Sequence, residues 1–275
     1  MTVRRDLAAR LQHNEASSFN GAMVSDPFSR RRFGFTVARR SGLVLLGSTR
    51  LAVPLFHRAI GFGVAAPASA ATLATVLRHY AELGADARIE VAEGIVPLDS
   101  VRLLERHGFR REREVHIVHV RTAAGPPEVR PVRGLDVDTV RQRDIRLFGR
   151  LARVGFEESG ERGAFVERST AFVLRAGTPG RFVGYIGRID GEPAATGLVC
   201  LTPGVGGLYS DTTLPAFRGR GIQKAMIRTR IERGLRRGRR IFTARTEGAN
   251  TSARNYEQTG FVPLYRASFW VRRTD

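Results

Sequence analysis

The sequence has 275 residues, 42% of them hydrophobic and 26% charged, and 45 Lys and Arg against 26 Asp and Glu give a formal net charge of +19. A chain of this length and composition is globular, with one large domain or two small ones. Because Cys200 is the single cysteine, an intrachain disulfide and a metal centre built on a cysteine cluster are both excluded.

Neither Cys200 nor the histidines indicate a metal site. Cys200 lies in the apolar run TGLVCLT, which favours a buried small side chain over a nucleophile. His116 and His119 are three residues apart on an expected strand, so they point to opposite faces of it. The sequence therefore predicts that no metal is bound.

The chain shows no signal for secretion or for a membrane. Residues 1–19 lack the apolar core of a signal peptide. The apolar stretch 41–76 is interrupted by Arg50, Pro54 and His57 and by several glycines, which argues against a membrane span. We therefore expect a soluble, cytoplasmic protein with no membrane partner.

Lys224 is the only lysine, so the positive charge comes almost entirely from arginine. Such a surplus attracts polyanions, including a nucleic acid or a coenzyme with three phosphates. The arginines that would form a nucleic-acid contact surface lie in and after one expected helix: Arg228, Arg230, Arg233, Arg236, Arg237, Arg239 and Arg240. They spread around that helix instead of forming one stripe, so nucleic acid is the partner that the sequence favours least.

The expected elements of the first half alternate between helix and strand. In chain order they are an amphipathic helix over 3–18, a hairpin turning at Arg40-Ser41-Gly42, a helix from Ser69 to Leu83 ended by Gly84, a strand at ARIEV, a helix from Pro97 to His107 ended by Gly108, and one or two strands over REREVHIVHVRT. The segment TAAGPPEVRPVRG that follows is rich in proline and glycine and reads as a linker. We therefore predict two domains, residues 1–124 and 125–275.

The second half predicts a mixed α/β fold with a mixed sheet. Its expected elements are helices over 137–153 and 165–175, strands at RFVGYIGRI and AATGLVCLT joined at Asp190-Gly191, a strand over 205–213, a helix from Ile222 to about Arg237, a strand at IFTART, a helix from Thr251 to Gln258, and a last strand in FVPLYRASFWVRR. In such sheets, ligands bind at the carboxyl ends of the strands. The loop after the strand 205–213 lies at such an end.

That loop reads Arg218-Gly219-Arg220-Gly221 and runs into the helix at Ile222. Glycines let the backbone approach a bulky anion, and the N–H groups at a helix start carry partial positive charge toward it. Arginines add charge-assisted donors. The loop therefore predicts a seat for a diphosphate, although a tight strand-to-helix turn with solvated arginines would have a similar sequence.

The loop resembles the acyl-CoA loop of the GNAT superfamily of N-acyltransferases, Arg/Gln-x-x-Gly-x-Gly/Ala. Arg218 and Gly221 match that pattern and Gln223 departs from it at the last position. The resemblance implies acetyl-CoA as co-substrate and a GNAT-like fold. The coenzyme-binding residues that it implies are Asp211, Thr212, Thr213, Arg218, Gly219, Arg220, Gly221, Ile222, Gln223, Asn250 and Tyr256.

A second stretch, EGANTSARNYEQTGF, resembles the closing motif of the same superfamily in outline. The resemblance implies that Tyr256 is the general acid that protonates the departing thiolate. A phenol with a pKa near 10 stays protonated at neutral pH and can serve in this way. The alternative is that Tyr256 is a core residue whose hydroxyl is satisfied by the protein.

The two halves also resemble each other. ARIEVAEGIVPLDSVRLLERHGF and IFTARTEGANTSARNYEQTGF share a strand, Glu-Gly, a helix and Gly-Phe, and Leu104 takes the place of Tyr256. The first half has no Arg-Gly-Arg-Gly loop. We therefore expect a tandem whose first half is a degenerate GNAT-like domain that completes the fold and walls the acceptor pocket.

The reaction that the resemblance implies is transfer of an acetyl group from acetyl-CoA to a primary amine, a small molecule or a peptide. Such a transfer needs a base for the ammonium nucleophile. Asp211 is one candidate, on the same strand face as Tyr209 and Thr213, and Glu157 and Glu158 are others. A domain that binds acyl-CoA without turnover, as a sensor or regulator, is the alternative function.

Overall fold

The computed structural model describes residues 2–51, 53–176 and 180–274. The chain divides into two compact units. The first consists of Met1–Val118, Thr246–Gly248 and Pro263–Asp275, and the second of His119–Arg245 and Ala249–Val262. These units differ from the predicted ranges 1–124 and 125–275, because the last strand of the chain packs with the first unit.

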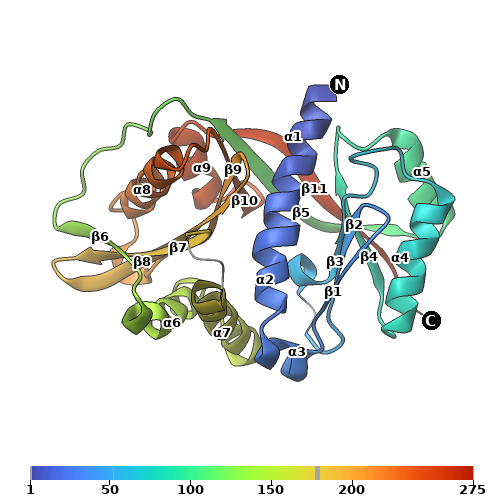
Figure 1. Cartoon of the computed structure of the whole chain (residues 1–275), viewed down its shortest axis with the longest axis horizontal. Helices are drawn as coiled ribbons and strands as arrows, with labels where there is room; N and C mark the ends of the chain where they lie inside the picture. Colours follow the sequence, from blue (N-terminus) through green and yellow to red (C-terminus); the bar gives the residue numbers. More distant parts are fainter. Residues whose placement is uncertain (1, 52, 177–179, 275) are drawn as a thin grey trace. The chain divides into compact units, whose positions relative to one another are not determined.

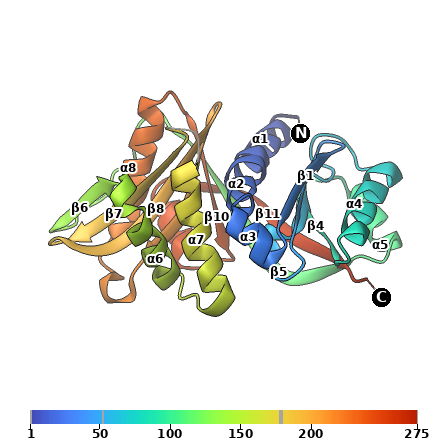
Figure 2. The same ribbon diagram turned by 60° about the horizontal axis from the view of Figure 1, so that its bottom comes forward.

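The first unit is a sheet with helices on both faces (Figures 1 and 2). Its strand order is β1 (Thr36–Arg40), β2 (Leu43–Gly47), β3 (Arg58–Ile60), β4 (Ala87–Ala92), β11 (Val262–Arg272) and the first part of β5 (Arg110–Thr122). β3 and β4 are parallel, whereas the pairs β1–β2, β2–β3 and β4–β11 are antiparallel. Its helices are α1 (Thr2–Gln12), a π-helix (His13–Asn20), α2 (Gly21–Val24), α3 (Pro27–Phe33), α4 (Ala70–Glu82) and α5 (Leu98–Arg106).

The local signals of the first half act as predicted. The hairpin of β1 and β2 turns at Ser41 and Gly42, which both take positive φ, as the two central residues of a tight hairpin turn require. Ser69 caps α4 by accepting the N–H of Thr72 at 3.2 Å, and Gly84 lies just beyond the helix with φ 61°. The predicted helix over 3–18 is present as α1 and the π-helix.

A buried ionic cluster lies in the core of the first unit. The Arg58 side chain is 0% exposed, with Nε 2.7 Å from Glu90 and Nη2 2.6 Å from Glu15. A fully buried guanidinium requires such carboxylate partners, because an uncompensated charge in the core is strongly destabilising. Arg58 therefore holds strand β3 to β4 and to the π-helix.

The second unit has the strand order β5, β10 (Ile241–Glu247), β9 (Val205–Thr213), β8 (Glu192–Thr202), β7 (Phe182–Ile189) and β6 (Leu135–Thr139), to which β5 contributes its last residues. β9 and β10 are parallel, and β6–β7, β7–β8 and β8–β9 are antiparallel. In Figure 1, α8 (Ile222–Arg236) and α9 (Thr251–Gln258) lie above these strands, and α6 (Ile145–Gly155) and α7 (Gly160–Ala176) lie below them. The mixed α/β fold class is confirmed.

One predicted helix begins later than expected. Residues 135–139 form strand β6, in which Val137 pairs with Gly187, and α6 begins only at Ile145. Leu135 and Val137 alternate with aspartates and pack against a buried cluster of the second unit. Alternation of apolar and polar residues is the pattern of a strand, so this segment forms a strand and not the predicted helix. The hairpin at Asp190-Gly191 is confirmed, with φ 50° and 85° at its two residues.

Within the described residues, no helix is both long and apolar enough to cross a membrane.

Candidate active site

The Arg-Gly loop joins β9 to α8 in the second unit. Gly219 and Gly221 have φ of 80° and 83°, in the left-handed region that favours glycine. A Cβ at Gly219 would meet no atom within 4 Å, and one at Gly221 would meet only Val132, at 3.6 Å. Glycine is therefore favoured at both positions by the backbone conformation and not by close packing, because there is room for a side chain at each.

The same loop leaves backbone donors open. Gly221 is the N-cap of α8 and provides no side-chain cap. Within the described chain, the N–H groups of residues 219–223 donate no hydrogen bond. Unsatisfied N–H groups at a helix start form a binding site for an anion. The predicted diphosphate seat thus has the necessary donors on the backbone.

The two parallel strands beside this loop pair along only part of their length. Residues 205–207 of β9 face residues 241–243 of β10, and the ladder ends at Gly207, although β9 continues to Thr213. Ser210 has φ 53°, and the register of β8 with β9 shifts between Thr196 and Leu198. These are the features of a β-bulge, which bends a strand and ends pairing locally.

The bulge also changes which side chains of β9 lie on the same face of the strand. Leu208 packs in one buried cluster with Tyr256, and Asp211 is hydrogen-bonded to the same tyrosine. Strict alternation would put residues 208 and 211 on opposite faces. Tyr209, next to Leu208, therefore lies on the face opposite to Asp211, and the prediction that the two share a face was wrong.

Asp211 and Tyr256 are brought together with Arg230 of α8, a residue that no sequence pattern placed in the site. Tyr256 Oη donates to Asp211 Oδ2, and both guanidinium Nη atoms of Arg230 donate to the same carboxylate, Nη1 at 2.9 Å. The Arg230 side chain is 0% exposed and that of Asp211 is 10% exposed. The buried arginine and the hydroxyl therefore both use the Asp211 carboxylate, and Asp211 does not stand as a free base.

The environment of Tyr256 keeps its hydroxyl protonated. Burial raises its pKa well above 10, the Asp211 charge raises it further, and Arg230 acts in the opposite direction. The His119 ring is stacked on the tyrosine ring, with centroids 5.9 Å apart. Tyr256 can therefore donate a hydrogen bond at any physiological pH, and in this structure it donates to Asp211.

Arg218 stabilises the loop through its side chain. Its Nε donates to the Thr213 carbonyl at 3.1 Å and its Nη2 to the Gly155 carbonyl at 3.3 Å, and Nη2 also pairs with Glu157 at 3.3 Å. Thr213 thus contacts Arg218 through its backbone carbonyl. Glu157, one of the candidate bases, is the partner of Arg218, and Glu158 follows it in the same connection.

Arg220 is exposed, and its guanidinium lies 5.4 Å from the centroid of the Phe217 ring. An arginine held in this way remains able to donate to a phosphate. Of the two loop arginines, Arg220 therefore has the freer side chain.

The other predicted ligands have side chains engaged by the protein. Thr212 is buried and its Oγ1 is 2.9 Å from Oγ1 of Thr196, while Ile222 is 1% exposed in a core cluster with Met226. Only the backbone of Ile222 can therefore meet a ligand.

Gln223, which departs from the family pattern, turns toward α9. Its Nε2 donates to Ser252 Oγ at 2.7 Å, and its Oε1 accepts from Asn255 Nδ2 at 2.7 Å. Asn250 caps α9 by accepting the N–H of Ala253 at 2.9 Å. These two side chains fix the start of α9, the helix that carries Tyr256.

Arg230 could have been found from the sequence. It lies four residues after Met226 and three after Ile227 on α8, so helical spacing places it on the buried face with them. A charged residue at such a position needs a partner of opposite charge. No local pattern names that partner as Asp211, because the two are joined only by the fold.

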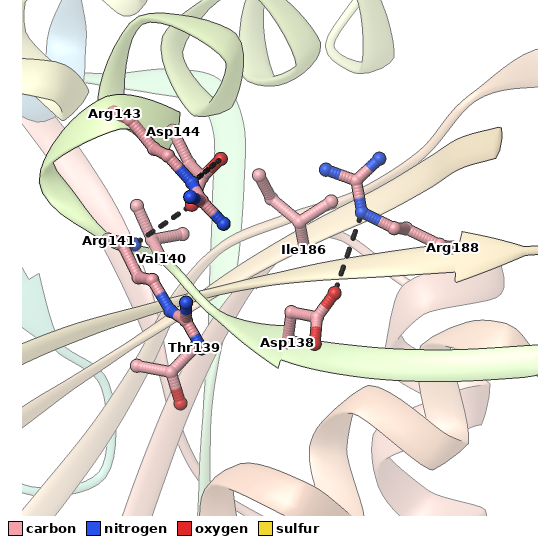
Figure 3. A pocket seen from close by; sticks show the side chains of 8 residues that line it. All are labelled: Asp138, Thr139, Val140, Arg141, Arg143, Asp144, Ile186 and Arg188. Atoms are coloured by element: carbon pink, nitrogen blue, oxygen red, sulfur yellow. Dashed lines mark hydrogen bonds and ion pairs between the residues drawn. The ribbon is translucent and has the colours of Figure 1, made fainter. Parts of the chain in front are cut away.

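A separate pocket of about 480 Å³ lies where β6 leads into α6 (Figure 3). It is lined by Asp138, Thr139, Val140, Arg141, Arg143, Asp144, Ile186 and Arg188. Within it, Arg188 pairs with Asp138 at 3.5 Å, and the Arg141 N–H donates to Asp144 at 3.2 Å (Figure 3). None of the predicted site residues lines this pocket, so it is not part of the candidate active site.

In the part of the chain that the structure describes, no group of three or more His, Cys, Asp or Glu side chains could hold a metal ion. Cys200 is buried, and burial raises the pKa of its thiol to about 12, so it is not a nucleophile.

Comparison with solved structures supports the fold. A GCN5-related N-acetyltransferase from Kribbella flavida is 17% identical, with 98% of this chain and 96% of that chain covered at a TM-score of 0.66. A GCN5-related N-acetyltransferase from Sphaerobacter thermophilus is 22% identical over 74% of this chain and 69% of that one, with a TM-score of 0.56. A tandem GNAT protein from the clavulanic acid biosynthesis pathway is 16% identical over 87% and 83%, with a TM-score of 0.58.

No curated protein sequence matches the chain. Residues 145–261 match the sequence model of the Acetyltransferase (GNAT) family. That range includes the Arg-Gly loop, Asp211, Arg230 and Tyr256. The chain therefore carries a domain of the GNAT acetyltransferase family over residues 145–261.

Proposed function

We propose that the protein is an N-acetyltransferase that moves an acetyl group from acetyl-CoA to a primary amine by direct attack in a ternary complex. The observation that carries the proposal is the start of α8, where two glycines with positive φ precede a helix whose first N–H groups have no partner within the described chain. A coenzyme with a diphosphate supplies the acceptors that such donors need.

The loop between β9 and α8 supplies the groups that would bind the coenzyme. The backbone N–H groups of residues 219–223 would hold the diphosphate, and Arg220 would add a charge-assisted hydrogen bond. The net charge of +19 would draw a polyanionic coenzyme to the protein. The loop is held in position by Arg218 through its contacts with Thr213 and Gly155.

Proton transfer is assigned to Tyr256. When the amine attacks the thioester carbonyl, the carbon–sulfur bond breaks and the thiolate takes the Tyr256 proton, while the protons of the ammonium nitrogen leave to a base or to water. Asp211 is bound to Arg230 and Tyr256, so we favour Glu158 or a water chain over Asp211 as that base.

A second candidate function is binding of acyl-CoA without turnover, as in a sensor. It is favoured by one observation: the Tyr256 residue is 2% exposed and its hydroxyl already donates to Asp211. Under this reading Tyr256 is a core residue, and the coenzyme seat alone is functional.

Two measurements test the proposal and separate these functions. Calorimetry with acetyl-CoA at up to millimolar concentration should give saturable heat, and a panel of primary amines, both small molecules and peptides, should yield free thiol in the presence of acetyl-CoA. Binding without thiol release from any amine would support the sensor. Absence of binding would overturn both.

A further inference from the structure

Arg230 is the one fully buried cation of α8 among the described residues, and its surroundings fix its position closely. Nε donates to the Met226 carbonyl at 3.0 Å, and Nη1 reaches both the Leu198 carbonyl at 3.4 Å and Asp211. A Cβ on Gly197 would lie 2.9–3.2 Å from the guanidinium, so glycine there makes the room for Arg230.

A series of hydrogen bonds leads from Arg230 to Tyr256, the candidate acid. Asp211 joins the guanidinium to the Tyr256 hydroxyl, so the direction of the Tyr256 proton depends on where Arg230 holds the carboxylate. The charged or titratable groups that face Tyr256 are Asp211 from β9, Arg230 from α8 and the stacked His119 from β5. The rest of its buried cluster is apolar: Ala123, Leu208, Ile227, Ile231, Phe242, Ala244 and Phe261.

We propose that Arg230 is a positioning residue for Tyr256, acting through Asp211. This inference rests on the proposed function, in which Tyr256 is the acid. Arg230 has two effects in it: it places the carboxylate that orients the hydroxyl, and it offsets the charge of that carboxylate.

The second effect matters during proton transfer. When the carbon–sulfur bond breaks, the Tyr256 O–H bond breaks as well, its proton goes to the thiolate sulfur, and the electron pair stays on the phenol oxygen. That phenolate would lie beside the Asp211 carboxylate, and two buried like charges repel strongly. The Arg230 charge on the same carboxylate lowers this cost, and water or the amine then returns a proton to the phenolate.

The alternative is that Arg230 and Asp211 form an ion pair that only stabilises the fold. A double-mutant cycle separates the two readings. The pair is replaced by Arg230→Met with Asp211→Leu, because apolar residues of similar volume often substitute for a buried ion pair without loss of stability. Tyr256→Phe is then made in this background and in the unchanged protein, and thiol release is measured with the amine that supports turnover.

A positioning role predicts coupling. Tyr256→Phe should slow thiol release by roughly 10²-fold or more in the unchanged protein and by less than about threefold in the background without the pair. Acetyl-CoA affinity, measured by calorimetry, should respond to Tyr256→Phe by the same factor in both backgrounds, so that the coupling is confined to turnover. If Tyr256→Phe cost the same factor in both backgrounds, the inference would be wrong.

A spectroscopic measurement keeps the test independent of activity and of the double variant's folding. Tyrosine labelled with ¹³C at Cζ reports the hydrogen bonding of the phenol, and comparison with Tyr256→Phe assigns the Tyr256 signal. Arg230→Lys should shift that signal. The matched control is Arg58→Lys, a buried arginine between two carboxylates in the first unit, which should leave the signal unchanged.

The two failures are distinguishable. If the unchanged protein neither binds acetyl-CoA nor releases thiol, the proposed function fails. If it does both, and Arg230→Lys moves neither the Tyr256 signal nor turnover beyond the effect of Arg58→Lys, only the inference about Arg230 is overturned.

Discussion

Leu104 and Tyr256 hold the same position in two copies of one strand–helix–turn arrangement. The Phe109 N–H donates to the Leu104 carbonyl at 3.1 Å, and the Phe261 N–H donates to the Tyr256 carbonyl at 3.1 Å. The glycine before each phenylalanine takes the left-handed conformation, as at many helix ends. Both side chains are buried. The two segments therefore have the same helix-ending hydrogen bond and a buried side chain at the same position, but only Tyr256 carries a hydroxyl there.

The first prediction concerns that hydroxyl. Tyr256→Phe should lower turnover on the order of 10²–10⁴-fold, because the thiolate would lose its proton donor, and should leave acetyl-CoA affinity nearly unchanged. Steady-state thiol release measures the turnover, and calorimetry measures the acetyl-CoA affinity. Turnover at the wild-type rate would show that Tyr256 is not the acid.

Tyr80→Phe is the matched control. Tyr80 is also fully buried, and its hydroxyl donates to the Leu46 carbonyl at 2.8 Å in the first unit. Removing it should cost about 1 kcal/mol of folding stability, the usual contribution of one buried hydrogen bond, with no change in turnover.

The second prediction tests the coenzyme seat. Gly221→Trp should abolish acetyl-CoA binding, because an indole at the N-cap of α8 would cover the open N–H groups. Gly238→Trp is its control: Gly238 also has positive φ, 74°, and a Cβ there would meet no atom within 4 Å. Both substitutions should cost roughly 1–2 kcal/mol of stability from the left-handed backbone, so only the loss of binding distinguishes them. Equal affinity in the two variants would contradict the assignment of this loop.

The third prediction concerns the space around Arg230. Gly197→Ala should destabilise the protein by about 1–3 kcal/mol, since the new methyl would crowd a guanidinium that is fixed on its other sides. Gly125→Ala, where a Cβ would meet nothing within 4 Å, should be within about 0.5 kcal/mol of the wild type. Urea denaturation measures both, and equal midpoints would mean that Arg230 can move aside.

The fourth prediction is a pH dependence. Burial lowers the pKa of His119 from 6.5, against a smaller opposing effect of Glu257. As the pH falls below 6.5 the unfolded chain takes up this proton before the folded chain does, so the free energy of unfolding decreases. His119→Phe should flatten the decline between pH 6.5 and the lowered pKa, as read from denaturation midpoints at a series of pH values.

If His119→Phe left the slope of stability against pH as it is in the wild type, His119 would not be held neutral by the fold.

Much of the second unit could be predicted from local sequence. The Asp190-Gly191 hairpin, the glycines of the Arg-Gly loop and the cap at Asn250 are all set by residues close together in the chain, because turn and cap conformations depend on a few neighbouring side chains. The strand over 135–139 was missed because a short strand between a linker and a helix carries few alternating residues.

Three features are local patterns that the residues predict without a structure: the mixed α/β order, the Arg-Gly loop with its resemblance to an acyl-CoA binding loop, and the position of Tyr256 near the end of a helix. Two others come from the packing of the folded chain: a bulge at Ser210 turns Asp211 toward Tyr256, and Arg230 binds the Asp211 carboxylate. Those contacts join residues far apart in the chain, and a buried charge is satisfied by whatever partner the packing brings to it, which no local pattern specifies.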